Sequence, residues 1–375
     1  MKKFHYYQIK LFSANIFILM SITSCFYDID DIPPDSEHLK TVLELVTSED
    51  NPRNSEGDFI ALDSGQIVFI YSHFFGNKYE GDNTPAYLAA RYSDDGGITW
   101  TKKDEIIIEN DGFINIMSVS LLRLQNGDIA LFYVKKNSID DCIPMMRISK
   151  DQAKSWSEAV PCIVDKKGYF VLNNDRVIQL GNGRLLVPVS RHRTLGGNWS
   201  NVGDIYCYYS DDDGKSWYSS AIVPNNKGIV VQEPGLIEMK DGIVMMYMRS
   251  TEGYQQLSYS YDSGESWSNI ESSQITSPLS PASIKIIPDS NDWIIIWNNS
   301  VSTNKGYYDK RTPLTTAISK DEGISWTNIK NIQDNPHGDY SYSAIHFVDK
   351  DNVLISYTSG FKTDIVLIHR KWFNY

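Results

Sequence analysis

The amino-acid sequence predicts an all-β protein, a six-bladed β-propeller with four antiparallel strands in each blade. Three observations predict this fold. A turn motif recurs five times, a β-rich hairpin pattern recurs six times, and a spare run near the N-terminus can complete the last hairpin. Because repeats override the usual size of about 150 residues per domain, we expect one domain over residues 39–375.

The turn motif, here called the Asp box, reads Ser-x-Asp-x-Gly-x-Ser/Thr-Trp. Its aspartate can accept hydrogen bonds from the backbone of the turn, its glycine supplies a positive φ, and its tryptophan can pack between neighbouring sheets. The second box has Ala153 where the others have glycine. We expect the boxes to be structural and to lie on the outer rim. They span residues 93–100, 149–156, 210–217, 260–267 and 319–326.

The hairpins set the number of blades. Each has two apolar runs around a tight turn, for which Asn-Gly and Asp-Gly are strong signals. They span residues 59–70, 121–132, 177–187, 236–246, 284–296 and 345–355. The first five are each followed by a third strand, an Asp box and a fourth strand, whereas the sixth is followed only by residues 364–369. We expect residues 41–46 to supply the missing strand, closing the ring and removing an open edge.

The N-terminal segment predicts export. Three lysines precede the apolar run 11–22, which is too short to span a bilayer. Cys25 stands at the expected cleavage point, which resembles the bacterial lipoprotein signal. This predicts a signal peptide over residues 1–24, a lipid on Cys25, a tether over residues 25–38, and a location at the outer membrane, the cell surface or the periplasm. Ordinary cleavage, with Cys25 as a bystander, is the alternative.

Composition narrows the functional classes. The chain has 375 residues, 41% of them hydrophobic, and a formal charge of −12, which suits a folded core and disfavours nucleic-acid binding. The histidines lack metal-ligand spacing, and no phosphate loop, dinucleotide fingerprint or Ser-His-Asp motif is present. We therefore expect a monomer with no metal and no cofactor. Cys142, Cys162 and Cys207 form one disulfide or remain buried thiols.

The innermost strand of each blade should begin near the propeller axis, so that six beginnings converge on one pocket. Counting back nine or ten residues from the hairpin turns gives Glu56, Ser118, Asn174, Glu233, Pro281–Ala282 and Tyr342. The ends of the second strands add His73, Arg191, His192 and Arg249. Polarity alone would not assign a function to these positions, because solvent reaches the mouth of a propeller channel and polar residues are expected there.

Three segments resemble segments of the sialidase superfamily. In residues 232–249 a glutamate opens one strand and an arginine ends the next. Residues 311–314, Arg-Thr-Pro-Leu, precede the fifth Asp box, as does a family segment with another substrate arginine. Residues 342–345, Tyr-Ser-Ala-Ile, resemble the segment that carries the nucleophilic tyrosine. The resemblance covers about residues 40–375.

The resemblance implies a role for each matched residue. Arg249 and Arg311 would bind a sugar carboxylate, Tyr342 would be the nucleophile, and Glu233 would be its base. The residue types suit these roles, because arginine binds carboxylates bidentately and a neutral tyrosine does not repel an anionic sugar. A phenol with a pKa of about 10 also needs a base.

Two segments depart from the family pattern. The first arginine of the family lies in an Arg-Ile-Pro motif, whereas the candidate here, Arg53, is followed by Asn-Ser. The catalytic aspartate of the family precedes the first Asp box, but Tyr87 occupies that slot here and Asp82 is the nearest acid. The acid that protonates the leaving oxygen is then Asp82 or Glu56.

The sequence thus predicts a sialidase-like hydrolase that removes terminal sialic acid, or a related acidic sugar, from a glycan. Glu56, Asn174 and Arg191 are further candidates for substrate contact. A polysaccharide lyase for uronic acids, or another glycosidase, could use the same groups. A noncatalytic glycan-binding propeller is the remaining alternative.

Overall fold

The computed structural model describes residues 38–300 and 310–373, and its regular structure is almost entirely β. The predicted signal peptide and Cys25 lie outside the described residues. The described residues contain two short 3₁₀ helices, η1 (Gly81–Asn83) and η2 (Arg370–Phe373). In the described ranges, no helix has the length and apolarity needed to cross a membrane.

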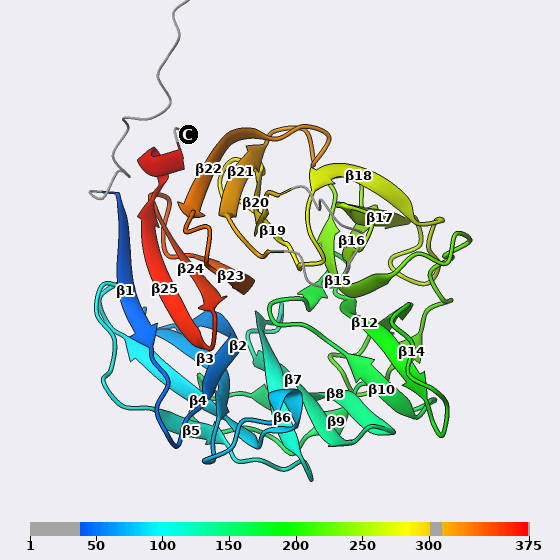
Figure 1. Cartoon of the computed structure of the whole chain (residues 1–375), viewed down its shortest axis with the longest axis horizontal. Coiled ribbons are helices and arrows are strands. Elements are labelled where there is room, and N and C mark those ends of the chain that lie inside the picture. Colours follow the sequence, from blue (N-terminus) through cyan, green and yellow to red (C-terminus); the bar gives the residue numbers. More distant parts are fainter. Residues whose placement is uncertain (1–37, 301–309, 374–375) are drawn as a thin grey trace, which may run out of the picture. The chain divides into compact units, whose positions relative to one another are not determined.

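Three sheets each contain four consecutive antiparallel strands, as the repeats predict (Figure 1). The first has β2 (Arg53–Ala61), β3 (Ile67–Phe74), β4 (Ala86–Ser93) and β5 (Glu105–Ile108). The second has β15 (Val231–Glu238), β16 (Val244–Ser250), β17 (Tyr254–Ser260) and β18 (Glu271–Thr276). The third has β19 (Ser283–Ile286), β20 (Trp293–Asn298), β21 (Leu314–Ser319) and β22 (Thr327–Gln333).

The fourth sheet combines the two ends of the described chain. It has β23 (Tyr340–Phe347), β24 (Asn352–Ser359), β25 (Lys362–His369) and, at its outer edge, β1 (Leu39–Leu45). β1 runs antiparallel to β25, with Thr41 opposite Val366 and Leu45 opposite Thr363. The prediction that an N-terminal strand completes the last hairpin is therefore confirmed.

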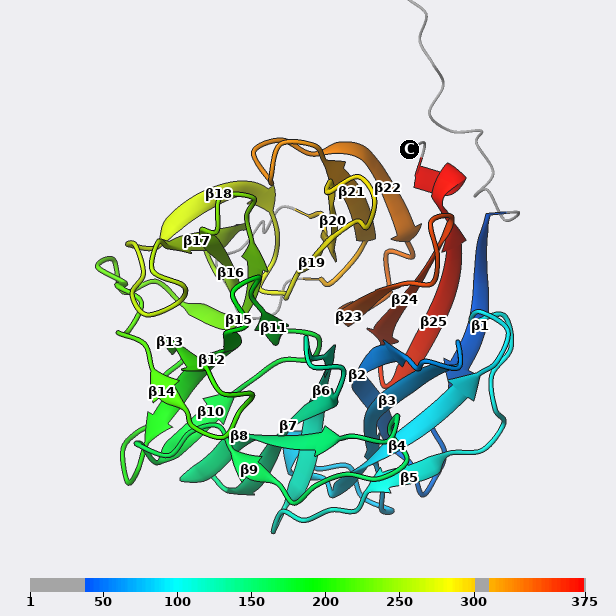
Figure 2. The ribbon, with the colours of Figure 1, turned by 180° about the vertical axis from the view of Figure 1, so that it is seen from behind.

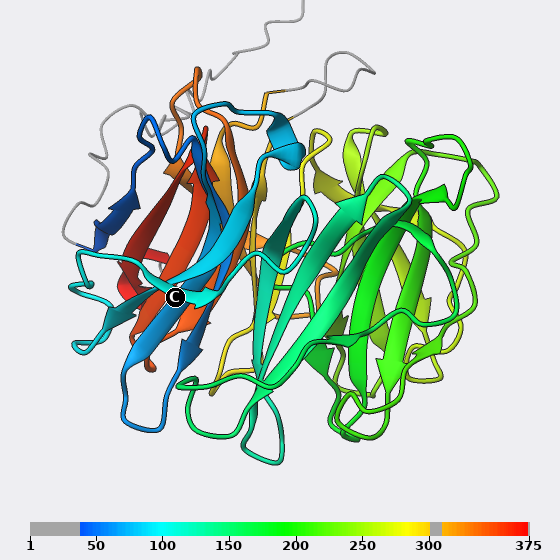
Figure 3. The same cartoon turned by 90° about the horizontal axis from the view of Figure 1, so that it is seen from below.

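The fifth sheet has nine strands and merges the predicted second and third blades (Figure 3). Its strands are β6 (Asn115–Arg123), β7 (Ile129–Ser138), β8 (Asp141–Ser149), β9 (Val160–Pro161), β10 (Gly168–Val171), β11 (Ile178–Gln179), β12 (Leu185–Thr194), β13 (Asp204–Ser210) and β14 (Tyr218–Ser219). The sequence did not predict β10, which pairs parallel with β8 and antiparallel with β12. Five sheets are seen rather than six separate blades, so a closed six-bladed ring is not confirmed.

Gly168 permits the β10 connection. A Cβ atom at this position would lie 2.2 Å from the carbonyl oxygen of Arg193, so no side chain fits between the two backbones. The two halves of the large sheet can therefore approach closely enough for β10 to pair with both.

The Asp boxes are structural turns, as expected. Asp95 Oδ1 accepts a hydrogen bond from the backbone N–H of Thr99 at 2.8 Å, and hydrogen bonds from Thr99 lower the pKa of Asp95 to about 2. Ala153 adopts the positive φ, 62°, that glycine supplies in the other boxes. Trp217 and Trp267 are buried in apolar clusters.

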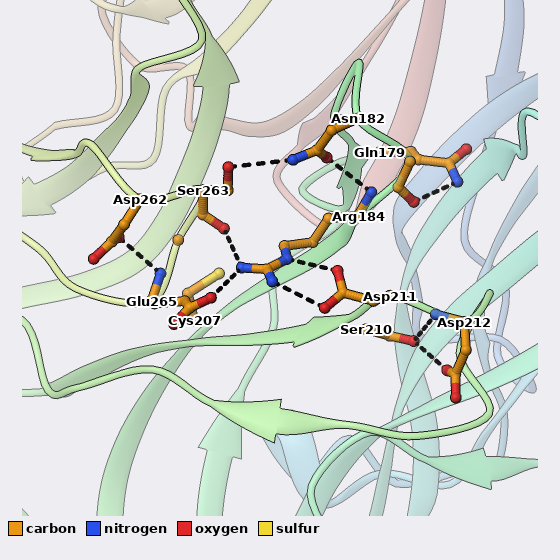
Figure 4. A network of polar contacts seen from close by, with 12 residues as sticks. Gln179, Asn182, Arg184, Cys207, Ser210, Asp211, Asp212, Asp262, Ser263 and Glu265 are labelled. Carbon is orange, nitrogen blue, oxygen red and sulfur yellow. Dashed lines mark hydrogen bonds and ion pairs between the residues drawn. The ribbon is translucent and has the colours of Figure 1, made fainter.

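The turn of the third hairpin is bonded both to the Asp box of its own sheet and to the Asp box of the following sheet. Arg184, in the turn before β12, donates to both carboxylate oxygens of Asp211 at 2.7 and 2.9 Å, and to Glu265 Oε1 at 2.9 Å (Figure 4). Asn182 Nδ2 donates to Ser263 Oγ at 3.2 Å. Because Glu265 and Ser263 belong to the fourth box, these contacts fix the large sheet against the next one.

The innermost strands contact one another directly. β2 contacts β6 and β23, β23 contacts β19, and β19 contacts β15. Figure 2 shows β23 between β2 and β19. Side chains at the starts of these strands are therefore brought together from segments far apart in the sequence.

Candidate active site

Four inner strands carry a non-glycine residue in the left-handed backbone region, at the same position near the start of each strand. These residues are Glu56, Ser118, Glu233 and Tyr342, with φ of 57°, 64°, 48° and 53°. A register shift accompanies each of them, as in a β-bulge, which re-aims a side chain. Such strain persists only where the surrounding structure enforces it, and it often marks functional sites.

Arg53 lies at the start of β2 and pairs with two carboxylates. Its Nη1 is 2.6 Å from Asp82 Oδ1, and its Nη2 is 3.1 Å from Glu56 Oε1. The guanidinium lies over the ring of Phe74, 4.6 Å from the centroid. Ser118 Oγ donates to Glu56 Oε2 at 2.9 Å. Burial raises the pKa of Glu56, although Arg53 and Ser118 act in the opposite direction.

Asp82 reaches Arg53 from η1, in the connection between β3 and β4. Asn115 Nδ2 donates to the carbonyl oxygens of Asp82 and Thr84 at 2.9 and 2.8 Å, and Lys136 Nζ donates to the Asp82 carbonyl at 3.0 Å. Loss of solvent works against the charge of Asp82, but Arg53 outweighs it and holds the pKa of Asp82 below its usual value. The sequence offset of Asp82 gave no indication of this pairing, which depends on the path of the loop.

Glu233 and Arg249 form a second charged pair, on β15 and β16. Arg249 Nη2 is 3.2 Å from Glu233 Oε1 and donates to Gln232 Oε1 at 2.7 Å. Glu233 Oε2, Arg249 Nε and Arg249 Nη1 are buried and have no hydrogen-bond partner among the described residues. Because unpaired buried polar atoms are costly, these three atoms point to a ligand or a reacting group.

Tyr342 lies next to the third arginine. The central carbon of the Arg311 guanidinium is 5.3 Å from the centroid of the Tyr342 ring, and Arg311 Nη1 donates to Ser341 Oγ at 3.0 Å. Burial and then Glu233 raise the pKa of Tyr342, while Arg311 and Arg249 lower it by a smaller amount. Because its pKa is raised, Tyr342 is a neutral phenol at neutral pH.

Asn174 and Arg191 have other partners in the described structure. Asn174 Nδ2 donates to the carbonyl oxygens of Gly57 and Tyr342 at 2.9 and 3.3 Å, so it holds the backbones of β2 and β23. Arg191 Nη2 is 2.7 Å from Asp204 Oδ2. Contact of Asn174 and Arg191 with substrate stays a prediction.

Sequence reasoning missed several supporting residues. Lys136, Ser341 and Gln232 each hold a residue of the site through a single hydrogen bond. Ser341 and Gln232 precede selected residues in the chain, a signal that was available. Lys136 faces η1 from β7, and nothing in the local sequence marks it.

The remaining reactive side chains of the described residues are the potential metal ligands and the cysteines. There, no three His, Cys, Asp or Glu side chains are grouped so that they could hold a metal ion. Cys142, Cys162 and Cys207 are free and buried, and burial raises the pKa of each thiol.

Comparison with known families identifies the family to which the chain belongs. The family model for the BNR repeat-like domain matches residues 70–355. The chain belongs to this family. Relatives among curated proteins include a sialidase of Bacteroides fragilis (strain YCH46), 27% identical over 223 residues, which is 56% of this chain and 38% of that protein. A sialidase of Paraclostridium sordellii is 24% identical over 219 residues, 51% of this chain and 52% of that protein.

Solved structures share the fold of this chain. A Hadza microbial sialidase has a TM-score of 0.70 at 17% identity, covering 85% of this chain and 66% of that chain. A protein of unknown function from Dyadobacter fermentans DSM 18053 has a TM-score of 0.69 at 19% identity, covering 90% of this chain and all of that chain. At such identities the likeness shows the fold. The chain spans about half of the curated relatives, or less.

Proposed function

We propose that this protein is a retaining glycosidase that removes a terminal sialic acid, or a related carboxylate sugar, from a glycan. The observation that carries the proposal is the Arg311 guanidinium over the ring of Tyr342, 5.3 Å from its centroid, at a phenol whose pKa burial raises above its usual value. A nucleophile for an anionic sugar should itself be uncharged and should lie beside guanidinium groups.

The proposed fold is a closed six-bladed propeller in which β10 ties the second and third blades together. The sheets support it, because the two halves of the nine-stranded sheet each repeat the four-stranded order and β1 completes the last sheet. In this fold the left-handed residues of the inner strands surround the axis, where one sugar ring would bind.

Three arginines would bind the substrate carboxylate. Arg249 offers Nε and Nη1, which are buried without partners, and Arg311 presents its guanidinium beside the Tyr342 ring. Arg53 supplies the third guanidinium from β2. On a protein with a net charge of −12, such a cluster concentrates positive charge where an anionic ligand is needed.

The proposed reaction has two steps. Tyr342 Oη bonds to the anomeric carbon and gives its proton to Glu233 Oε2, while the glycosidic C–O bond breaks and Asp82 protonates the leaving oxygen. Water then attacks the anomeric carbon and gives a proton to Asp82. The Tyr342 C–O bond breaks, and Glu233 returns the proton to the phenolate.

We also propose, from the sequence alone, that the mature chain is anchored by a lipid on Cys25 at the bacterial surface or in the periplasm. Radiolabelled palmitate tests this anchor. Label should appear in the wild-type chain and be absent from Cys25→Ala, with Cys207→Ala as the matched thiol control.

Hydrolysis of an aryl sialoside tests the enzymatic proposal. The wild type should release the coloured phenol, and Tyr342→Phe should lower kcat by about a hundredfold or more, because the nucleophile is lost. Tyr340→Phe, two residues away on β23, is the control and should keep the activity. No turnover, together with glycan binding that survives Tyr342→Phe, would instead identify a binding module. New double-bond absorbance with a uronic-acid polymer would identify a lyase.

A further inference from the structure

Arg53 is held by two carboxylates that differ in how firmly they are fixed. Glu56 is buried, and its second oxygen accepts a hydrogen bond from Ser118. Asp82 has a side chain that is 57% exposed, and among the described residues its carboxylate pairs with one side chain, that of Arg53. Of the two, Asp82 is therefore the one that can leave Arg53 without breaking other bonds.

Only the side chain of Asp82 would have to move. Its backbone carbonyl is held by Asn115 and Lys136, so η1 stays in place while the carboxylate rotates about its side-chain bonds. Such rotation of an exposed side chain is fast compared with turnover. Arg53 Nη1 then becomes available, while Nη2 remains on Glu56.

We propose that Asp82 occupies, in the free protein, the place of the substrate carboxylate on Arg53, and that an arriving carboxylate displaces it and makes it the proton donor. This inference rests on the proposed function, because it concerns an acidic sugar at the same site. It assigns Glu56 to positioning Arg53, and it explains how Asp82, the acid of the proposed reaction, acquires its proton.

The charges around Asp82 explain why displacement would change its protonation. The titratable and charged groups that interact with Asp82 are Arg53 and Glu56 from β2, Lys136 from β7, Cys142 from β8, Tyr169 from β10 and Arg249 from β16. An incoming carboxylate would engage Arg53 and Arg249 and add a negative charge nearby. Lys136 would then be the only one of these cations still acting on Asp82 without an anionic partner, so the pKa of Asp82 must rise.

The consequence is that ligand binding takes up a proton. Between the depressed pKa of Asp82 in the free protein and its raised pKa in the complex, the complex holds one more proton than the free protein. By linkage, affinity for the carboxylate ligand must then fall as pH rises through this window.

Calorimetric titration with N-acetylneuraminic acid, in buffers of different ionisation enthalpy, tests the inference. The wild type should take up close to one proton, and the methyl ester of the ligand should cause no uptake. Asp82→Asn should abolish the uptake and tighten binding about fivefold, because the competing carboxylate is gone. Glu56→Gln should weaken binding, because Arg53 loses its support. Glu80→Gln, an acid of the same loop that pairs with Lys78, is the matched control and should match the wild type.

The outcomes separate this inference from the proposed function. If the wild type cleaves the aryl sialoside but binds without proton uptake, or if Asp82→Asn binds no more tightly, displacement is overturned and the glycosidase proposal stands. If the wild type neither binds N-acetylneuraminic acid nor cleaves the sialoside, both are overturned.

Discussion

The guanidinium of Arg311 lies over the ring of Tyr342, 5.3 Å from its centroid. This arrangement joins the connection before β21 to the inner strand β23, and it places a cation where a phenol would have to lose its proton. The same arginine donates to Ser341, the residue before Tyr342 in the chain, so its orientation is fixed.

Replacing Arg311 should therefore impair both binding and chemistry. We expect Arg311→Lys to lower kcat/KM for an aryl sialoside by about a hundredfold, because lysine keeps the charge but loses the planar fork and its bond to Ser341. Arg193→Lys, which alters an arginine paired with Asp140, is the control. Wild-type kinetics in Arg311→Lys would remove Arg311 from the site.

Asp82→Asn should show an effect that depends on the leaving group. A poor leaving group such as a sugar hydroxyl needs protonation, whereas nitrophenol does not. We expect kcat to fall about a hundredfold or more for a sialyl disaccharide and by much less for the nitrophenyl substrate. Equal losses for both substrates would contradict the role of Asp82 as an acid.

Asp104 should make stability depend on pH in the acid range. It accepts a hydrogen bond from the Tyr71 hydroxyl at 2.7 Å and pairs with His73 and Arg91. Burial works against its charge, but these partners outweigh burial and hold its pKa well below the usual value. The stabilisation is therefore complete above the unfolded-state pKa of about 3.9 and is lost as pH falls toward the folded-state pKa.

Urea unfolding of Asp104→Asn measures this contribution. At pH 7 the free energy of unfolding should be lower than that of the wild type by about 1–3 kcal/mol, and the difference should shrink below pH of about 4. Asp128→Asn, at an exposed turn, serves as the control. A difference that does not change with pH would assign the loss to packing rather than to charge.

Gly168→Ala should loosen the joint between the two halves of the large sheet. Its Cβ would meet the Arg193 carbonyl oxygen at 2.2 Å, so we expect a loss of about 1–3 kcal/mol in unfolding free energy and faster amide exchange in β10. Gly181→Ala, whose Cβ would meet its nearest atom at 3.7 Å, should be close to neutral. Unchanged exchange in Gly168→Ala would show that β10 does not depend on this close approach.

Local sequence predicted most of the strands and much of the candidate site, because each hairpin turn fixes the position of every residue in the strand before it. Counting back from each turn reached Glu56, Ser118, Glu233 and Tyr342, the residues in the left-handed conformation. At the third hairpin the count gave Asn174, whereas the left-handed residue is Asp175. Arg191 and His192, both reached at the end of the second strand, point to opposite faces, because neighbouring strand residues face opposite sides. Burial lowers the pKa of His192, and Glu233 and Arg249 act on that pKa in opposite directions.

Long-range pairing could not be read from the sequence. β10 is a short apolar segment whose partners, β8 and β12, are defined only by the folded arrangement. The contact between Arg53 and Asp82 depends on a loop held by Asn115 and Lys136. Neither contact leaves a periodic pattern in the chain.

The pairing of β1 with β25 sets an order of events for synthesis. A ribosome makes β1 more than 300 residues before β25, so the nascent chain carries an unmatched edge until residues 362–369 have been made. Premature termination anywhere before Lys362 would leave that edge permanently unsatisfied. Such truncated chains should be substrates for quality control and not partly active fragments.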